Sequence, residues 1–119
     1  RERTEIERDI ANYTVIEHAG ILFGCVALCP YPDERTGAMA ALTVSPLSQS
    51  QGDGERLLKR VEQRARQSGL DSIFVLTTRT MHWFLKRGFQ QADPDQLPEA
   101  RRRLYNWDRK SQVLVKKLG

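Results

Sequence analysis

A short glycine-containing segment is the part of the sequence best suited to bind a ligand. It runs Gln49-Ser50-Gln51-Gly52-Asp53-Gly54 and joins an apolar stretch to a helical pattern that begins near Glu55. Glycine lets the backbone approach a ligand closely, and the first turn of a helix presents N–H groups without intrahelical partners at the positive end of its dipole. These features favour a phosphate-binding turn. The spacing matches neither a Walker loop nor a dinucleotide-binding turn, and a glycine-rich turn without a ligand is the alternative.

The two cysteines offer little chemistry of their own. Cys25 and Cys29 are four residues apart in a segment predicted to be a strand, so their side chains share a face and lie about 13 Å apart. That separation is too large for a disulfide, and no neighbouring histidine or second cysteine pair completes a zinc site. We interpret them as reduced core cysteines of a cytoplasmic protein and expect no metal.

Composition and charge limit the possible partners. The chain has 119 residues, 39% hydrophobic and 29% charged, as expected for one globular domain. Its net charge of +4 is uneven, because residues 1–44 carry 4 basic and 7 acidic side chains and residues 45–119 carry 15 and 8. A basic second part suits an anionic partner. No apolar run approaches the roughly 20 residues of a membrane span, the charged start does not suit a signal peptide, and the absence of an initiator methionine suggests part of a longer protein.

The elements that must position the glycine segment follow from hydrophobic periodicity. Leu57, Leu58, Val61 and Ala65 form one stripe of a helix over residues 55–67, and Ile6 and Ile10 share a face if residues 1–10 are helical. A third, short helix is predicted over 80–86. The predicted strands are 13–17, 21–28, 36–44, 72–77, 89–91 and 112–115. The strand–helix–strand unit from 36 to 77 implies a parallel crossover, so the fold class is α/β with a mixed sheet.

Several segments together resemble one protein family. Residues 41–46 and the glycine segment are similar to the cofactor strand and pyrophosphate loop of the GNAT acetyltransferases, and Trp83-Phe84-Leu85-Lys86-Arg87-Gly88-Phe89 is similar to the F-Y-x-x-x-G-F segment of that superfamily. The runs 74–79, 82–84, 87–89, 97–98, 104–106 and 109–111 extend the resemblance to the bacterial N-acetylglutamate synthases over nearly the whole chain. The resemblance implies that residues 1–119 form a GNAT acyl-CoA N-acyltransferase domain that lacks the first strand and helix, with an amino-acid-kinase-like domain upstream.

The resemblance also implies an activity and its binding residues. The expected reaction moves the acetyl group of acetyl-CoA directly to the α-amino group of L-glutamate, the first step of arginine biosynthesis. Arg1, Arg109 and Ser111 match positions that hold the glutamate, and a guanidinium suits a carboxylate because its planar fork donates two parallel hydrogen bonds. The expected acetyl-CoA-binding residues are Leu42, Thr43, Val44, Gln49, Ser50, Gln51, Gly52, Asp53, Gly54 and Glu55.

Two positions decide how catalysis is expected to work. Phe84 replaces a tyrosine that donates a proton to the leaving thiolate in many GNAT enzymes, so Thr77 is the predicted catalytic donor; the alternative is a β-branched residue that only ends a strand. Ala38 stands where the family often has glutamate, and a missing general base typically costs about 10²–10⁴-fold in rate. Asp33 or Glu34, acting through water, is the hypothesis for a substitute.

Other functions stay open at this stage. The chain could acetylate a different amine, or bind CoA with little or no turnover because of Ala38. Nucleic-acid binding through Arg101, Arg102 and Arg103 is disfavoured, because three adjacent arginines cannot face one groove from a helix and aromatic residues are sparse. We expect a homo-oligomer when the protein is full length, and no nucleic-acid or membrane partner.

Overall fold

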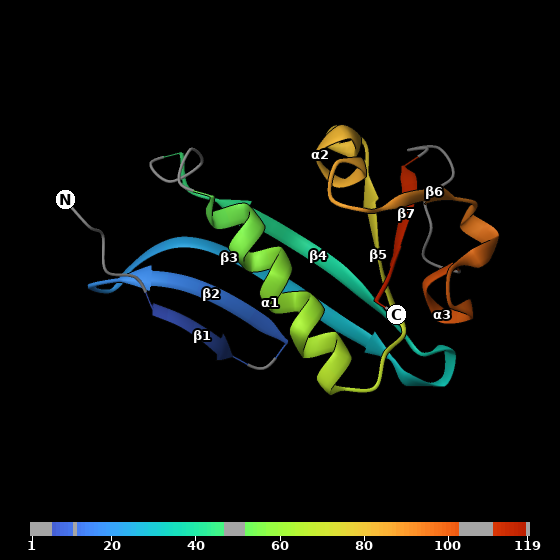
Figure 1. Cartoon of the computed structure of the whole chain (residues 1–119), viewed down its shortest axis with the longest axis horizontal. Coiled ribbons are helices and arrows are strands. Elements are labelled where there is room, and N and C mark those ends of the chain that lie inside the picture. The colour runs from blue at the N-terminus through green and yellow to red at the C-terminus, as the bar shows by residue number, and fades with distance from the viewer. Residues whose placement is uncertain (1–5, 11, 47–51, 103–110, 119) are drawn as a thin grey trace.

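One mixed β-sheet organises the molecule, and it is described from a computed structural model for residues 6–10, 12–46, 52–102 and 111–118. In these residues the strand order is β1-β2-β3-β4-β5-β7-β6 (Figure 1). The strands are β1 (Ile6–Ile10), β2 (Tyr13–His18), β3 (Ile21–Tyr31), β4 (Thr36–Val44), β5 (Ser72–Thr77), β6 (Gln90–Ala92) and β7 (Gln112–Lys117). The helices are α1 (Asp53–Gln67), α2 (Met81–Leu85) and α3 (Glu99–Arg102), with 3₁₀ turns η1 (Pro32–Glu34) and η3 (Pro94–Gln96).

Most of the predicted elements are confirmed. The predicted strands 36–44 and 72–77 have the bounds of β4 and β5, and the helix predicted over 55–67 is α1, which begins two residues earlier. β2 and β3 form the expected antiparallel hairpin, with Gly20 at φ 79° in its turn. None of the helices in the described ranges is long and apolar enough to cross a membrane.

The helix predicted over residues 1–10 is wrong for its described part. Ile6–Ile10 is strand β1, which pairs antiparallel with β2 from Ile6↔Glu17 to Ile10↔Tyr13. A spacing of four puts two isoleucines on one face of a helix and also on one face of a strand, so periodicity alone did not decide between them. Pairing with the edge of β2 then outweighed the weak local preference for helix.

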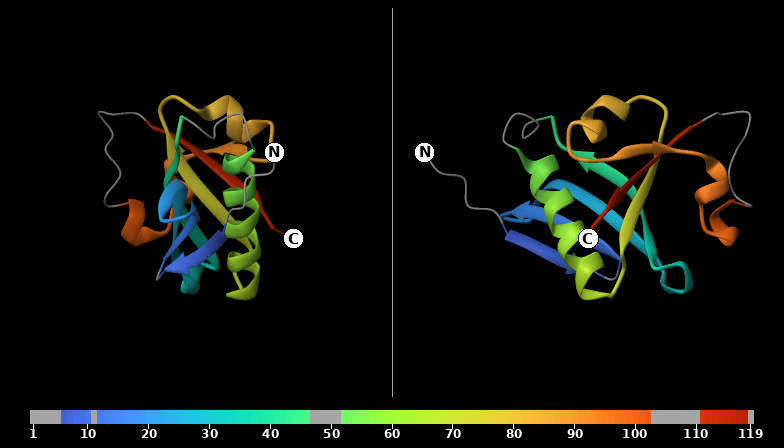
Figure 2. Two further views of the ribbon diagram at one scale, coloured as in Figure 1. Left: turned by 90° about the vertical axis from the view of Figure 1, so that its left-hand side faces the viewer. Right: turned by 45° about the vertical axis from the view of Figure 1, so that its right-hand side comes forward.

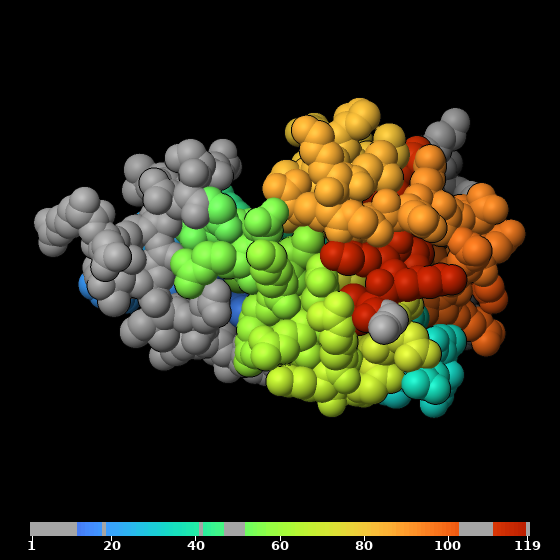
Figure 3. Space-filling view, viewed as in Figure 1, coloured from blue at the N-terminus to red at the C-terminus, as the bar shows by residue number. Residues whose placement is uncertain are grey.

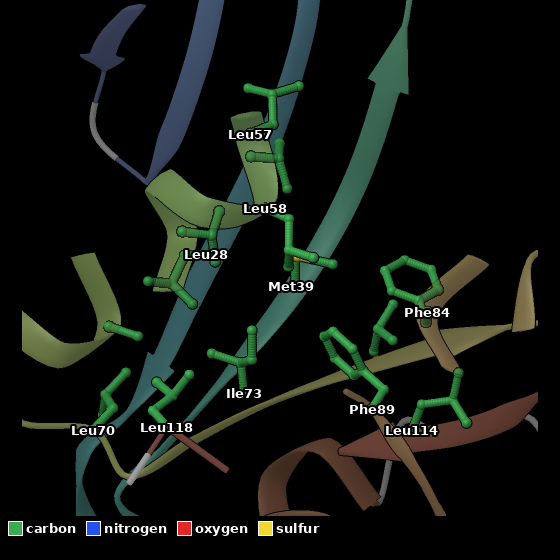
Figure 4. Close-up of a cluster of buried hydrophobic side chains, with 14 of the residues drawn as sticks. Leu28, Met39, Leu57, Leu58, Leu70, Ile73, Phe84, Phe89, Leu114 and Leu118 are labelled. Carbon is green, nitrogen blue, oxygen red and sulfur yellow. The ribbon is translucent and has the colours of Figure 1, made fainter. Parts of the chain in front are cut away.

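The main core lies between the sheet and α1. Helix α1 lies across the sheet (Figure 1) and contacts strands β2, β3, β4 and β5. Figure 4 shows Leu57 and Leu58 near Met39 of β4, with Phe84 and Phe89 further along the same face. Polar contacts also hold the helix: for example, Lys116 Nζ lies 2.7 Å from Glu62 Oε2, and Arg64 Nη1 donates to Thr14 Oγ1 at 3.1 Å. These contacts fix the second half of α1 relative to the sheet.

The opposite face of the sheet carries a smaller core. Ala38, Phe74 and Val113 point away from α1 and pack with Leu97, which precedes α3. The left view of Figure 2 shows α1 and α3 on opposite sides of the sheet. Side chains that alternate along β4 and β5 therefore face two different layers.

The strands β4 and β5 separate along their length. Their parallel pairing covers only Thr36↔Ser72, Gly37↔Ile73 and Ala38↔Phe74, whereas both strands continue beyond it. The register of β4 with β3 shifts between Ala27↔Ala40 and Cys25↔Thr43, where β4 has one extra residue. Such a bulge bends the strand locally and strengthens its twist. A gap consequently opens in the sheet between the ends of β4 and β5.

Candidate active site

A cavity of about 780 Å³ occupies the gap between β4 and β5 and extends to the starts of α1 and α2. In the space-filling view, a notch opens between the green start of α1 and the yellow-orange atoms of α2 (Figure 3). The lining residues are Ala38, Met39, Ala40, Leu42, Val44, Gly52, Gly54, Glu55, Val75, Leu76, Thr77, Thr80, Trp83, Phe84, Arg87 and Arg101.

The cavity passes through the sheet from one face to the other. Met39 and Val75 belong to the core on the α1 side, whereas Ala38 and Leu76 belong to the cluster on the α3 side. All four line the same cavity. Ligand atoms between the strands could therefore contact residues of both faces.

The start of α1 forms the end of the cavity predicted to bind phosphate. Gly52 has φ 79° and ψ 15°, a left-handed conformation that glycine adopts without steric cost. The first helical hydrogen bond within this turn runs from the Arg56 amide to the Gly52 oxygen at 3.1 Å, so the amides of Gly54 and Glu55 precede it. A Cβ on Gly54 would lie 3.2 Å from the ring of Trp83, so a side chain there would crowd the cavity wall.

The other predicted cofactor-binding residues have different surroundings. Leu42 and Val44 are half-buried and line the cavity. Thr43 is exposed opposite Cys25 and is not part of the lining, and Asp53 is buried, with its carboxylate 3.4 Å from Arg56 Nη1. Gln49, Ser50 and Gln51 lie outside the described residues.

Charged groups also meet at this end. Arg87 Nε lies 3.3 Å from Glu55 Oε1, an ion pair that lacks the alignment of a hydrogen bond. The guanidinium of Arg87 stacks 3.9 Å above the Trp83 ring, and its Nη1 donates to the Trp83 oxygen at 2.9 Å. Glu55 and Arg87 thus tie the start of α1 to the turn after α2.

Thr77 lies where β5 ends and its side chain lines the cavity. Its Oγ1 accepts hydrogen bonds from the amides of Thr80 (3.0 Å) and Arg79 (3.3 Å) and lies 2.8 Å from Thr80 Oγ1. The two amides occupy the oxygen lone pairs, which leaves the hydroxyl proton to be donated to Thr80 or into the cavity. The hydroxyl therefore closes the turn before α2 and is also available as a donor.

The residues predicted to bind the acceptor are only partly described. Ser111 is half-buried and immediately precedes β7, whose first residue, Gln112, pairs with Thr77. Ser111 therefore lies near the end of β5. Arg1 and Arg109 lie outside the described residues.

The position of Ala38 bears on the missing base. Ala38 is buried in the cavity wall, and among the described lining residues Glu55 supplies the one carboxylate, which is paired with Arg87. Asp33 and Glu34, the hypothetical substitutes, line a separate groove with Tyr31 and Pro98. Neither is part of the cavity wall.

Trp83, Arg87 and Arg101 are among the lining residues that were not recognised as site residues from the sequence. Trp83 was named only as part of a segment similar to a family motif, and Arg101 was considered only as part of an arginine run. Arg87 is four residues after Trp83, a helical spacing that could have suggested the cation–π contact. Arg101 had no local signal, because its neighbours in the cavity come from β4 and β5. Within the described ranges, no group of three or more histidine, cysteine or acidic residues is arranged to hold a metal.

Comparison with known proteins agrees with this geometry. The sequence model of the Acetyltransferase (GNAT) family matches residues 1–89. The chain is 68% identical over 118 residues to an amino-acid acetyltransferase of Ralstonia nicotianae and 46% identical over 119 residues to that of Escherichia coli K12, covering 99% and 100% of this chain. It spans about a quarter of the length of these relatives, 26% and 27%.

A solved structure is similar throughout the fold. N-acetylglutamate synthase from Neisseria gonorrhoeae, complexed with coenzyme A and N-acetyl-glutamate, superposes with a TM-score of 0.86 at 43% identity, over 92% of this chain and 26% of that one. The similarity expected from the sequence motifs is thus confirmed. The chain belongs to the acetyltransferase (GNAT) family.

Proposed function

We propose that this domain transfers the acetyl group of acetyl-CoA to the α-amino group of L-glutamate, giving N-acetyl-L-glutamate and CoA. The observation that carries the proposal is the cavity lined by residues from both faces of the sheet, with the glycine turn and the start of α1 at one end. The Neisseria enzyme, complexed with coenzyme A and N-acetyl-glutamate, supports this choice of cofactor and acceptor.

The proposed cofactor position uses the α1 side of the cavity. Amides at the start of α1, including those of Gly54 and Glu55, would hold the diphosphate. The main chain of Leu42 and Val44 would bond the pantetheine arm as a strand bonds its neighbour, since pairing between β4 and β5 ends at Ala38. The thioester would then reach the gap in the sheet.

The proposed reaction is a direct attack. The neutral α-amine adds to the thioester carbonyl, a C–N bond forms, the C–S bond breaks, and the thiolate leaves. Thr77 would donate a hydrogen bond that stabilises the thiolate, which takes up the proton released by the attacking amine. Neither Cys25 nor Cys29 lines the cavity, so an acyl-enzyme on either thiol is disfavoured. Because Ala38 cannot accept a proton, ordered water is the proposed route for the ammonium proton.

A steady-state assay tests the proposal. The natural protein is supplied with acetyl-CoA and a panel of amino acids and amines, and CoA release and product mass are measured. We expect glutamate to give the highest kcat/KM, and initial-rate plots that intersect, as a ternary complex requires. A preference for another amine, or parallel plots, would contradict this proposal.

A second candidate follows from Ala38 itself. A domain that binds CoA with little or no turnover would have the same glycine turn and the same alanine in the wall. Calorimetric titration with CoA, followed by glutamate, distinguishes the two: glutamate binding to the CoA complex with no acetylated product would favour the binding domain.

The chain spans about a quarter of the length of its relatives. Domain organisation, oligomeric state and metabolic role are therefore proposed for a longer protein that contains this chain. We propose that an amino-acid-kinase-like domain precedes this one, that the full-length protein is a homo-oligomer, and that it opens arginine biosynthesis in the cytoplasm. Mass measurement of the natural protein by light scattering tests the oligomeric state.

A further inference from the structure

We propose that Arg101 binds a carboxylate of the acceptor amino acid and so helps to select a dicarboxylic acceptor, an inference that rests on the function proposed above. Arg101 lies on α3, on the opposite side of the sheet from α1 (Figure 2). It nevertheless lines the cavity between β4 and β5. Its side chain thus approaches the reaction site from the face opposite the glycine turn.

Local packing fixes α3 in this position. Leu97, just before the helix, is 4% exposed and packs against Ala38, Phe74 and Val113 of the sheet. The Arg102 amide donates to the main-chain oxygen of Pro98 at 2.8 Å, and Arg102 Nη1 donates to the main-chain oxygen of Asp95 at 3.1 Å. Arg102 is thereby tied to the turn, whereas its neighbour Arg101 lies against the cavity.

The charges of the cavity leave Arg101 unmatched. Among the described lining residues the charged side chains are Glu55, Arg87 and Arg101. Glu55 and Arg87 pair with each other at 3.3 Å. The half-buried Arg101 side chain makes no ion pair or hydrogen bond with the rest of the described chain. A guanidinium that loses hydration without gaining a partner is costly, so an anionic ligand would stabilise it.

The position favours the acceptor over the cofactor as that ligand. The diphosphate is assigned to the start of α1, on the other face, next to Gly54. Arg101 instead shares its side of the cavity with Ala38 and Leu76, whose side chains carry no charge. Glutamate brings two carboxylates, and a planar guanidinium can bind either of them with two parallel hydrogen bonds.

The test compares Arg101→Gln with Arg102→Gln in the natural full-length protein. Arg102 is the matched control, because it is the adjacent arginine and does not line the cavity. We expect Arg101→Gln to raise the glutamate KM by about 10- to 100-fold, the loss typical of one charged hydrogen-bonded contact, with the acetyl-CoA KM and CoA affinity within about twofold of wild type. Arg102→Gln should leave both KM values within about twofold.

Two further measurements separate binding from packing. Arg101→Lys keeps the charge but loses the fork, so its glutamate KM should lie between those of wild type and Arg101→Gln. The kcat/KM ratios of glutamate to glutamine and of glutamate to isoglutamine report which carboxylate is bound, and Arg101→Gln should lower one of these ratios. An unchanged glutamate KM, or equal rises in both KM values, would overturn the role of Arg101 while glutamate acetylation by the wild type stands. A wild-type protein that leaves glutamate unacetylated would overturn the proposed function as well.

Discussion

The two faces of the sheet differ in how firmly they are built. On the α1 face, a long amphipathic helix buries Leu57, Leu58 and Val61 against four strands, and the charged residues lining that end of the cavity are already paired. On the α3 face, Leu97 secures a helix of four residues, and Arg101 is unpaired among the described residues. If the proposed binding positions hold, the first face would suit a constant cofactor, and the second could adapt to another acceptor with few substitutions.

The largest expected effect lies where the two faces meet. Replacing Ala38 with glutamate puts a proton acceptor into the cavity wall, and we expect kcat to rise by about 10²–10⁴-fold with CoA affinity unchanged. Ala38→Gln is the matched control, since it adds similar volume without a base. Equal rates for the two variants would mean that the proton leaves by another route.

The difference between the two cores is measurable as stability. Leu58 on α1 is 2% exposed and Leu97 before α3 is 4% exposed. We expect Leu58→Ala to lower the free energy of unfolding by about 3–4 kcal/mol and Leu97→Ala by about 2 kcal/mol. The loss is smaller for Leu97 because the smaller cluster relaxes more easily into the void that the shortened side chain leaves. Urea denaturation gives both values. Equal losses would show that the α3 face is as firmly packed as the α1 face.

Thr77 allows a test of chemistry against structure. Thr77→Val removes the hydroxyl and should lower kcat by about 100-fold, whereas Thr77→Ser keeps the donor and should stay within about fivefold of wild type. Rapid-quench kinetics would report the chemical step directly. If Thr77→Val lost stability but kept kcat, the hydroxyl would serve only to close the turn before α2.

The smallest expected effect concerns the ion pair between Glu55 and Arg87, at the end of the cavity proposed to bind the cofactor. Glu55→Gln removes a negative charge near the start of α1 and releases Arg87, so CoA should bind about 2- to 5-fold more tightly at low salt, and the gain should fade as salt screens it. Titration calorimetry at two ionic strengths measures this. Glu34→Gln, on the separate groove, is the control, and a matching gain there would point to net charge alone.

The firmer face was also the more predictable one. β4 and β5 are continuous apolar runs, and α1 has an apolar stripe at helical spacing that ends at Ser68-Gly69. The local sequence was therefore enough to predict where these elements begin and end. The contribution of α3 could not be predicted in this way, because four residues carry no periodic signal and a helix that short depends on tertiary contacts. Arg101 therefore looked like part of a surface run. The predicted roles of Arg1 and Arg109 stay predictions, since both residues lie outside the described part of the chain.

The early end of pairing between β4 and β5 gives the sheet an edge in its interior. An edge strand normally risks recruiting another chain, but here α1 and α2 flank the gap, so a narrow extended ligand fits where a second protein would not. Beyond Ala38, β4 has no strand partner among the described residues on its β5 side, and the pantetheine arm would occupy that position. Amide hydrogens of β4 beyond Ala38 should then exchange with solvent more slowly when CoA is bound, while those facing β3 should hardly change.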